Sequence, residues 1–145
     1  MLQTILSIVG VLIAAIGIPI LYFQLRDMKA SVRSSAHTAI YGQAETFRGY
    51  LIQYPHLRKY FFENVEIEAD NKNYNRVISI AEIYLNYLEQ IAVLKDSFGK
   101  ENIDSLRRFI KTALEKSPIL RQHLRSNAPL YSDALHRMAE EKSKP

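Results

Sequence analysis

The sequence predicts an all-α protein in which an N-terminal transmembrane helix continues into a stalk and is followed by a small antiparallel helical bundle. None of the first 25 of its 145 residues is charged, although the chain carries 19 Lys and Arg and 15 Asp and Glu. Beyond that segment, apolar residues recur at steps of three or four, which is the helical period. Only the brief stretch 65–68 alternates apolar and polar residues as a strand does, so no strand is expected.

The first expected element is a membrane span. Ile5–Leu25 is a run of 21 residues without a charge, and a helix needs about 20 residues to cross the hydrocarbon of a bilayer. A secretory signal peptide begins with basic residues and ends a shorter apolar run at a cleavage site, whereas no basic side chain precedes this run. We therefore expect residues 1–25 to form an uncleaved anchor, kinked near Pro19. Cleavage and a buried soluble helix are the alternatives.

The basic residues after this run predict its orientation. Arg26, Lys29 and Arg33 lie within eight residues of its end, with one nearby acid, Asp27. Basic residues remain on the cytoplasmic side of a membrane and attract anionic lipid. The lipid bilayer is thus the first expected partner, and residues 26–145 are expected in the cytoplasm.

Small residues occupy one face of the expected membrane helix. Ser7, Gly10, Ala14 and Gly17 are separated by steps of three or four, and small residues let two membrane helices approach closely. This face predicts a packing surface for a second helix. The alternative is that small residues are simply common in membrane helices.

A stalk helix is expected over residues 26–54, followed by a bundle over 55–140 that packs on the stalk. Pro55 ends the stalk because the residue before a proline is disfavoured in the helical region, and an interruption near Ser34-Ser35 or Gly42 is also considered. The bundle's expected elements are a short helix 55–64, a loop 63–75, a central helix 72–97 ended by Phe98-Gly99, a helix from Asn102 or Asp104, a short helix opened by Ser117-Pro118, a last helix from Asn127 through Met138, and a frayed tail 141–145.

The chain shows no pattern that predicts catalysis, a metal or a cofactor. It has no Cys, and its four His are not spaced to place two ligands on one helical face. Glu82 and Glu89 are seven residues apart on the most apolar helix, where paired carboxylates can act as acid and base or hold a metal. A carboxylate metal site in a bundle would also need His on these helices. We therefore predict structural ion pairing of both residues with Arg48, Arg58 or Arg107.

The net charge of +4 and the pI near 9.3 do not favour a nucleic-acid partner. Part of this charge is explained by the orientation signal after the anchor, and the other basic residues are interspersed with acids. A solvated surface is the simplest interpretation of the basic C-terminal helices, with lipid or nucleic acid as alternatives.

Five segments of the second part of the chain combine apolar, aromatic and capping residues: 55–63, 76–82, 84–90, 117–120 and 130–131. Together these segments resemble a widespread kind of uncharacterised bacterial single-pass inner-membrane protein with a small helical cytoplasmic domain. The resemblance covers roughly residues 45–135 and implies location in the bacterial inner membrane, but it implies no activity and no site residue.

The leading hypothesis is a membrane-tethered helical protein-interaction module that binds a protein partner or itself. The anchor, the small-residue face and the lack of a catalytic pattern motivate it. The alternative is a small membrane effector of the defence or toxin type, which perturbs the inner membrane by oligomerising. An enzyme is not expected.

Overall fold

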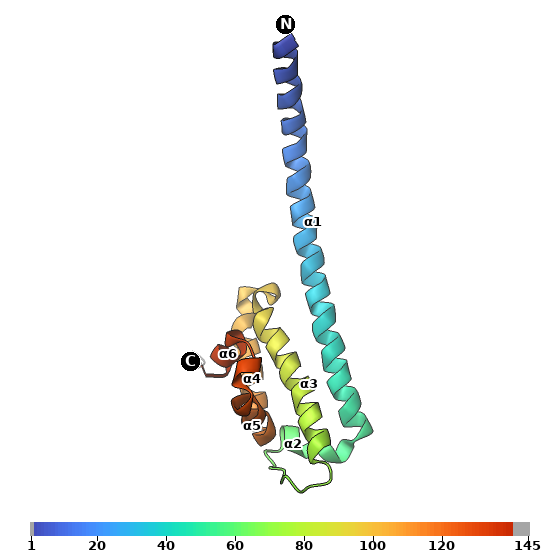
Figure 1. Cartoon of the computed structure of the whole chain (residues 1–145), viewed down its shortest axis with the longest axis vertical. Coiled ribbons are helices and arrows are strands. Elements are labelled where there is room, and N and C mark those ends of the chain that lie inside the picture. The colour runs from blue at the N-terminus through green and yellow to red at the C-terminus, as the bar shows by residue number, and fades with distance from the viewer. Residues whose placement is uncertain (1, 141–145) are drawn as a thin grey trace. The chain divides into compact units, whose positions relative to one another are not determined.

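The prediction of an all-α fold is confirmed by a computed structural model, which describes residues 2–140 and the side chains of residues 15–99 and 101–140. All regular elements within residues 2–140 are helical (Figure 1). The α-helices are α1 (Leu2–Gln53), α2 (Lys59–Phe62), α3 (Tyr74–Val93), α4 (Ile103–Glu115), α5 (Pro118–Ser126) and α6 (Asp133–Glu140). Short 3₁₀ segments are η1 (Pro55–Leu57), η2 (Lys95–Phe98), η3 (Lys100–Asn102) and η4 (Ala128–Leu130).

The chain divides into two compact units, residues 1–37 and 38–145, so that α1 contributes to both. In the first unit, large apolar side chains are exposed along the helix from residue 16 to residue 32. Their exposed fractions lie between 50% and 67%. These side chains are Ile16, Ile18, Ile20, Leu21, Tyr22, Phe23, Leu25, Met28 and Val32.

Within the described part of the chain, no helix combines the length and the apolar character that crossing a bilayer requires. The predicted transmembrane helix is therefore not found among the described residues. The side chains of residues 5–14, about half of the predicted span Ile5–Leu25, lie outside the described set, as does the tail 141–145.

The end of α1 was predicted correctly from Pro55. The helix runs to Gln53 without a break at Ser34-Ser35 or Gly42, and Tyr54 leaves the helical region with φ −127° and ψ 67°. A proline disfavours the helical conformation of the residue before it. The chain turns here into η1 and α2, whose Leu57 and Phe61 are fully buried.

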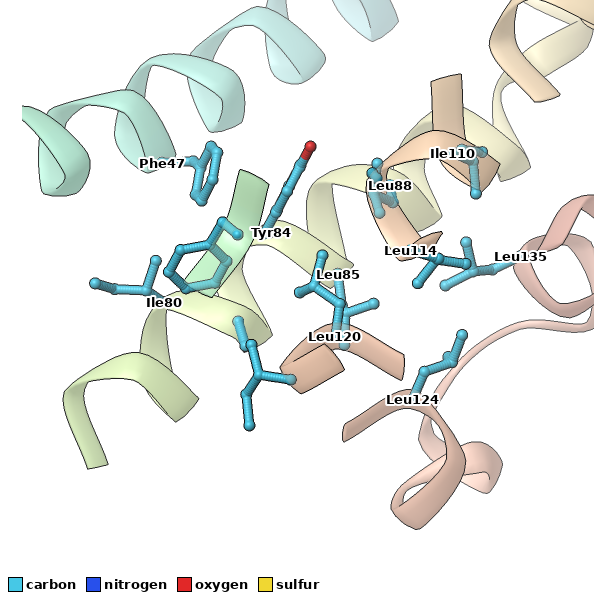
Figure 2. Close-up of a cluster of buried hydrophobic side chains, with 14 of the residues drawn as sticks. Phe47, Ile80, Tyr84, Leu85, Leu88, Ile110, Leu114, Leu120, Leu124 and Leu135 are labelled. Atoms are coloured by element: carbon cyan, nitrogen blue, oxygen red, sulfur yellow. The ribbon is translucent and has the colours of Figure 1, made fainter. Parts of the chain in front are cut away.

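The core of the second unit is built around α3, which packs against α4, α5 and α6. Eight residues of α3 are buried, consistent with the apolar stripes that predicted a central helix. Figure 2 shows Leu85 and Leu88 of α3 among Leu120 of α5 and Leu135 of α6, while Phe47 of α1 lies beside Tyr84. Residues 38–53 of α1 therefore belong to the same core as the bundle.

Ser117 joins two elements that are far apart in the sequence. Its buried hydroxyl donates a hydrogen bond to the carbonyl oxygen of Tyr60 at 2.8 Å and accepts a longer one from the backbone N–H of Leu120 at 3.5 Å. The second contact confirms Ser117 as the N-cap of α5, with Pro118 in the first turn. An N-cap side chain satisfies a backbone donor that the helix itself cannot.

Two expected boundaries differ from the structure. The central helix ends at Val93 rather than near Ser97, and η2 follows before Gly99 turns the chain with φ +87°. The last helix does not start at Asn127, because Tyr131 is extended and α6 begins only at Asp133.

Candidate functional site

An apolar groove runs between residues 40–52 of α1 and the bundle, and we call it the aromatic groove. Its larger hollow has a volume of about 380 Å³, and an adjoining hollow of about 250 Å³ shares Ala44, Arg48, Tyr87 and Phe109 with it. The larger hollow is also lined by Phe47, Leu51, Ile52, Arg58, Phe62 and Tyr84. The volume of the larger hollow is within the range typical of small-molecule sites, and that of the adjoining hollow is slightly below it.

Stacked rings form the wall of this groove. Phe47 of α1 stacks on Tyr84 of α3 with ring centroids 4.0 Å apart and an interplanar angle of 18°. Tyr84 lies 6.1 Å from Tyr87, and Tyr87 meets Phe109 of α4 edge to face at 6.1 Å. Phe62 approaches Phe47 at 6.2 Å. Rings at such distances attract one another in addition to burying apolar surface, so these contacts stabilise the wall.

The hydroxyl of Tyr84 is a polar group inside this apolar wall. Tyr84 is only 4% exposed, and within the described residues its hydroxyl has no hydrogen-bond partner. Burial, with a smaller contribution from Tyr87, raises the pKa of Tyr84 to about 12. In Figure 2 the ring of Tyr84 extends away from Leu85 and lies beside Phe47, and Tyr84 lines the groove. The hydroxyl is not among the buried side-chain atoms that lack a hydrogen-bond partner, so water reaches it at the groove.

Two arginines stand at the groove. Arg48 and Arg58 are both exposed, and neither forms an ion pair with any described residue. The guanidinium of Arg58 lies over the ring of Phe62 at 4.9 Å. The pKa of Tyr87 is raised overall, because burial raises it more than Arg48 lowers it. The effect of Arg48 shows that its positive charge lies near the Tyr87 hydroxyl. Glu45 is the acid that lines the smaller hollow.

Of the predicted small-residue face, only Gly17 has a described environment. A Cβ atom placed on Gly17 would meet nothing within 4 Å. Ser7, Gly10 and Ala14 lie outside the residues whose side chains are described. The packing face therefore stays a prediction.

The predicted basic flank lies on the surface of α1. Arg26 reaches Asp27 at 3.8 Å, with both side chains largely exposed, and its guanidinium lies 5.4 Å from the ring centre of Phe23. Lys29 and Arg33 are exposed.

The structure gives Glu82 and Glu89 partners that the sequence did not indicate. Oε1 of Glu82 lies 3.7 Å from Nε2 of His123, and Oε1 of Glu89 accepts a hydrogen bond of 2.6 Å from the backbone N–H of Ser132. Both carboxylates also raise the pKa of Tyr131, although burial is the larger cause. Glu89 thus holds the chain directly before α6.

Among the described residues, no three His, Cys, Asp or Glu side chains are grouped so that they could hold a metal ion. The basic residues of the C-terminal helices are partly engaged within the fold. Nη1 of Arg121 donates to the carbonyl oxygens of Leu114 at 2.8 Å and Glu115 at 2.6 Å, and Arg107 pairs with Asp104 at 2.7 Å. Arg121 thereby satisfies backbone acceptors at the end of α4.

Comparisons with protein families, with characterised proteins and with solved structures found no match to this chain.

The aromatic groove was missed in the sequence because its parts had other interpretations. The helical period of apolar residues accounts for Phe47 and Tyr84 as core positions, and ion pairing with Glu82 and Glu89 accounts for Arg48 and Arg58. The sequence signal available for the groove was the pair Arg48 and Arg58, because both lie next to aromatic residues. Both arginines are distant in sequence from the tyrosines of α3, so the sequence did not show that these residues meet. Periodicity identifies which face of a helix is apolar, but it does not show which part of that face remains uncovered.

Proposed function

We propose that this chain is a membrane-tethered helical module that acts by binding a protein partner or a second copy of itself, rather than by catalysis. In this proposal residues 1–25 anchor it once in the bacterial inner membrane, with the C-terminal domain in the cytoplasm. The observation that carries the proposal is the exposure of nine large apolar side chains between residues 16 and 32. A contiguous apolar surface of this kind marks contact with a membrane or a partner.

Charge supports the same arrangement. Seven of the nine exposed apolar side chains lie within the charge-free residues 1–25, and the first charged residues are Arg26 and Asp27. Arg26, Lys29 and Arg33 then supply the basic flank that keeps the following domain in the cytoplasm. Tyr22 and Phe23 precede them, where aromatic side chains favour the headgroup region.

Membrane attachment is tested by extracting bacterial membranes that contain the full chain with alkaline carbonate. We expect the chain to remain in the pellet, and a variant lacking residues 1–25 to appear in the supernatant. A reporter fused to the C-terminus should be active only if it is of a kind that functions in the cytoplasm. Extraction of the full chain by carbonate would reject the anchor.

Self-association is tested by crosslinking in membranes. Replacing Gly10 and Ala14 together by Leu should lower the crosslinked fraction several-fold, because bulky residues keep two helices apart. Ala15→Leu is the matched control, since Ala15 lies off the small-residue face. An equal effect of Ala15→Leu, or no crosslinked species in the unaltered chain, would reject self-association. Loss of membrane potential on expression would instead favour the membrane effector.

A further inference from the structure

We propose that the aromatic groove binds one long-chain fatty-acid carboxylate, with its hydrocarbon chain along α1 and its head at Arg48 and Arg58. No part of the argument uses the anchor, because all groove residues lie between 40 and 109. The proposal is therefore independent of the proposed function, and either can fail alone.

The dimensions of the groove fit a single acyl chain. The residues of α1 that line it extend from Ile40 to Ile52, which is about 18 Å of helix at 1.5 Å per residue. A bilayer core of about 30 Å contains two leaflets, so one extended chain occupies roughly 15 Å. A protein helix is about 10 Å across and would place only side chains in a hollow of about 380 Å³, whereas an acyl chain can lie along its whole length.

The lining fits a hydrocarbon chain with one anionic end. Phe47, Leu51 and Phe62 offer apolar contact along the larger hollow, and burying hydrocarbon there is favourable in proportion to its area. Arg48 and Arg58 supply positive charge that no described acid neutralises by an ion pair. An arginine fork matches the two oxygens of a carboxylate.

The hydroxyl of Tyr84 adds a hydrogen-bond donor to the groove. Tyr84 is 4% exposed and lines the larger hollow, and its hydroxyl is not among the buried side-chain atoms that lack a hydrogen-bond partner. Water therefore reaches this donor, and a carboxylate oxygen is an acceptor that can replace the water. Glu45 lines the smaller hollow together with Arg48, whereas no acid lines the larger hollow, which favours the head at the larger one.

The test mixes the purified full chain, whether or not it inserts, with phosphatidylcholine nanodiscs and a palmitate analogue that carries a photoreactive diazirine. After irradiation we expect labelled peptides from residues 40–52 and from α3, and competition by oleate. Lysophosphatidylcholine has one chain but a zwitterionic head, which cannot replace the charge-assisted contacts of a carboxylate with Arg48 and Arg58. It should therefore compete at least about tenfold less well. Equal competition by lysophosphatidylcholine would overturn the recognition of an anion, and better competition by lysophosphatidylglycerol would overturn the carboxylate.

Matched variants locate the head. Arg48→Glu with Arg58→Glu should weaken oleate competition by about tenfold or more, whereas Arg137→Glu changes charge at an exposed position of α6 and should leave it unchanged. Partition of the probe into the nanodisc is the same for all variants and cancels. Equal effects of the two changes would overturn the assignment.

A variant that fills the groove tests the position of the chain without changing charge. Ala44 lines both hollows, so Ala44→Leu should reduce labelling while the near-ultraviolet circular dichroism of the tyrosines stays native. Undiminished labelling in a folded Ala44→Leu variant would overturn the proposal. Crosslinks between two copies through Tyr41 and Ile52, in place of labelling, would show that a second copy covers the groove and would likewise overturn it.

Discussion

The buried side chain of Ser117 connects two elements of the bundle. Ser117 is fully buried, and its hydroxyl bonds the carbonyl oxygen of Tyr60, which lies 57 residues earlier. Removal of one partner from a buried hydrogen bond costs about 1–3 kcal/mol, because the other partner is left without solvent. The hydroxyl therefore contributes as a cap of α5 and as a tie between α2 and α5.

Tyr84 makes the stability of the fold depend on alkaline pH. Burial raises the pKa of Tyr84 from 10.0 to about 12, so the folded state favours the protonated hydroxyl. That contribution is fully present below pH 10 and is lost as the pH rises to 12. At pH 11 the loss is about 1.4 kcal/mol, one pK unit's worth of free energy.

We therefore expect Tyr84→Phe to lose less stability than the unaltered chain between pH 8 and pH 11. The difference in free energy of unfolding should grow by about 1.4 kcal/mol in favour of the variant. Urea unfolding at both pH values measures it, with Tyr41→Phe as the control because Tyr41 is 69% exposed. Parallel pH profiles of Tyr84→Phe and the unaltered chain would contradict the prediction.

At the scale of elements, two glycines differ in whether their backbone conformation accepts another residue. Gly49 is inside α1, where an added Cβ meets nothing within 4 Å, whereas Gly99 has φ +87° after η2. Glycine weakens a helix relative to alanine by about 0.5–1 kcal/mol. An L side chain at a positive φ of this kind costs about 1–3 kcal/mol.

Gly49→Ala should thus raise the midpoint of thermal unfolding, and Gly99→Ala should lower it. The two variants receive the same methyl group and serve as controls for each other. Unfolding is followed by circular dichroism of the full chain in detergent. A shift of the same sign in both variants would show that backbone conformation does not determine their effects.

The helix boundaries show which parts of the fold could be predicted from the sequence. Those after Tyr54 and at Ser117-Pro118 were predictable, because proline acts on its immediate neighbours. The start of α6 was not predictable, since the backbone N–H of Ser132 is held by Glu89 from 43 residues away. The aromatic groove was hidden for the same reason. Its geometry depends on the stack of Phe47 and Tyr84, whose distance no local pattern encodes.

At the scale of the whole molecule, the folding unit crosses the boundary that the sequence suggested between a stalk and a bundle. The second compact unit begins at residue 38, and α1 contributes Ile40, Phe47 and Leu51 to its core at 5–7% exposure. Truncating a buried Phe or Leu to Ala costs about 2–5 kcal/mol, while a domain has about 5–15 kcal/mol of stability in total. The second half of α1 is therefore part of the folded domain.

Two fragments test this boundary. Residues 38–145 should unfold in one cooperative transition, because the fragment retains every α1 side chain of the core cluster. Residues 55–145 lose Phe47, so the rings of Tyr84 and Phe61 lose their partner. We expect this shorter fragment to keep helical far-ultraviolet circular dichroism but to lose the near-ultraviolet signal of ordered tyrosines, as loosely packed states do. Residues 26–145 are the control and should match 38–145 in midpoint and cooperativity. If residues 55–145 unfolded with the same midpoint as 38–145, α1 would contribute nothing essential to the core. The side of the aromatic groove that α1 forms would then be a surface contact and not part of the folded core.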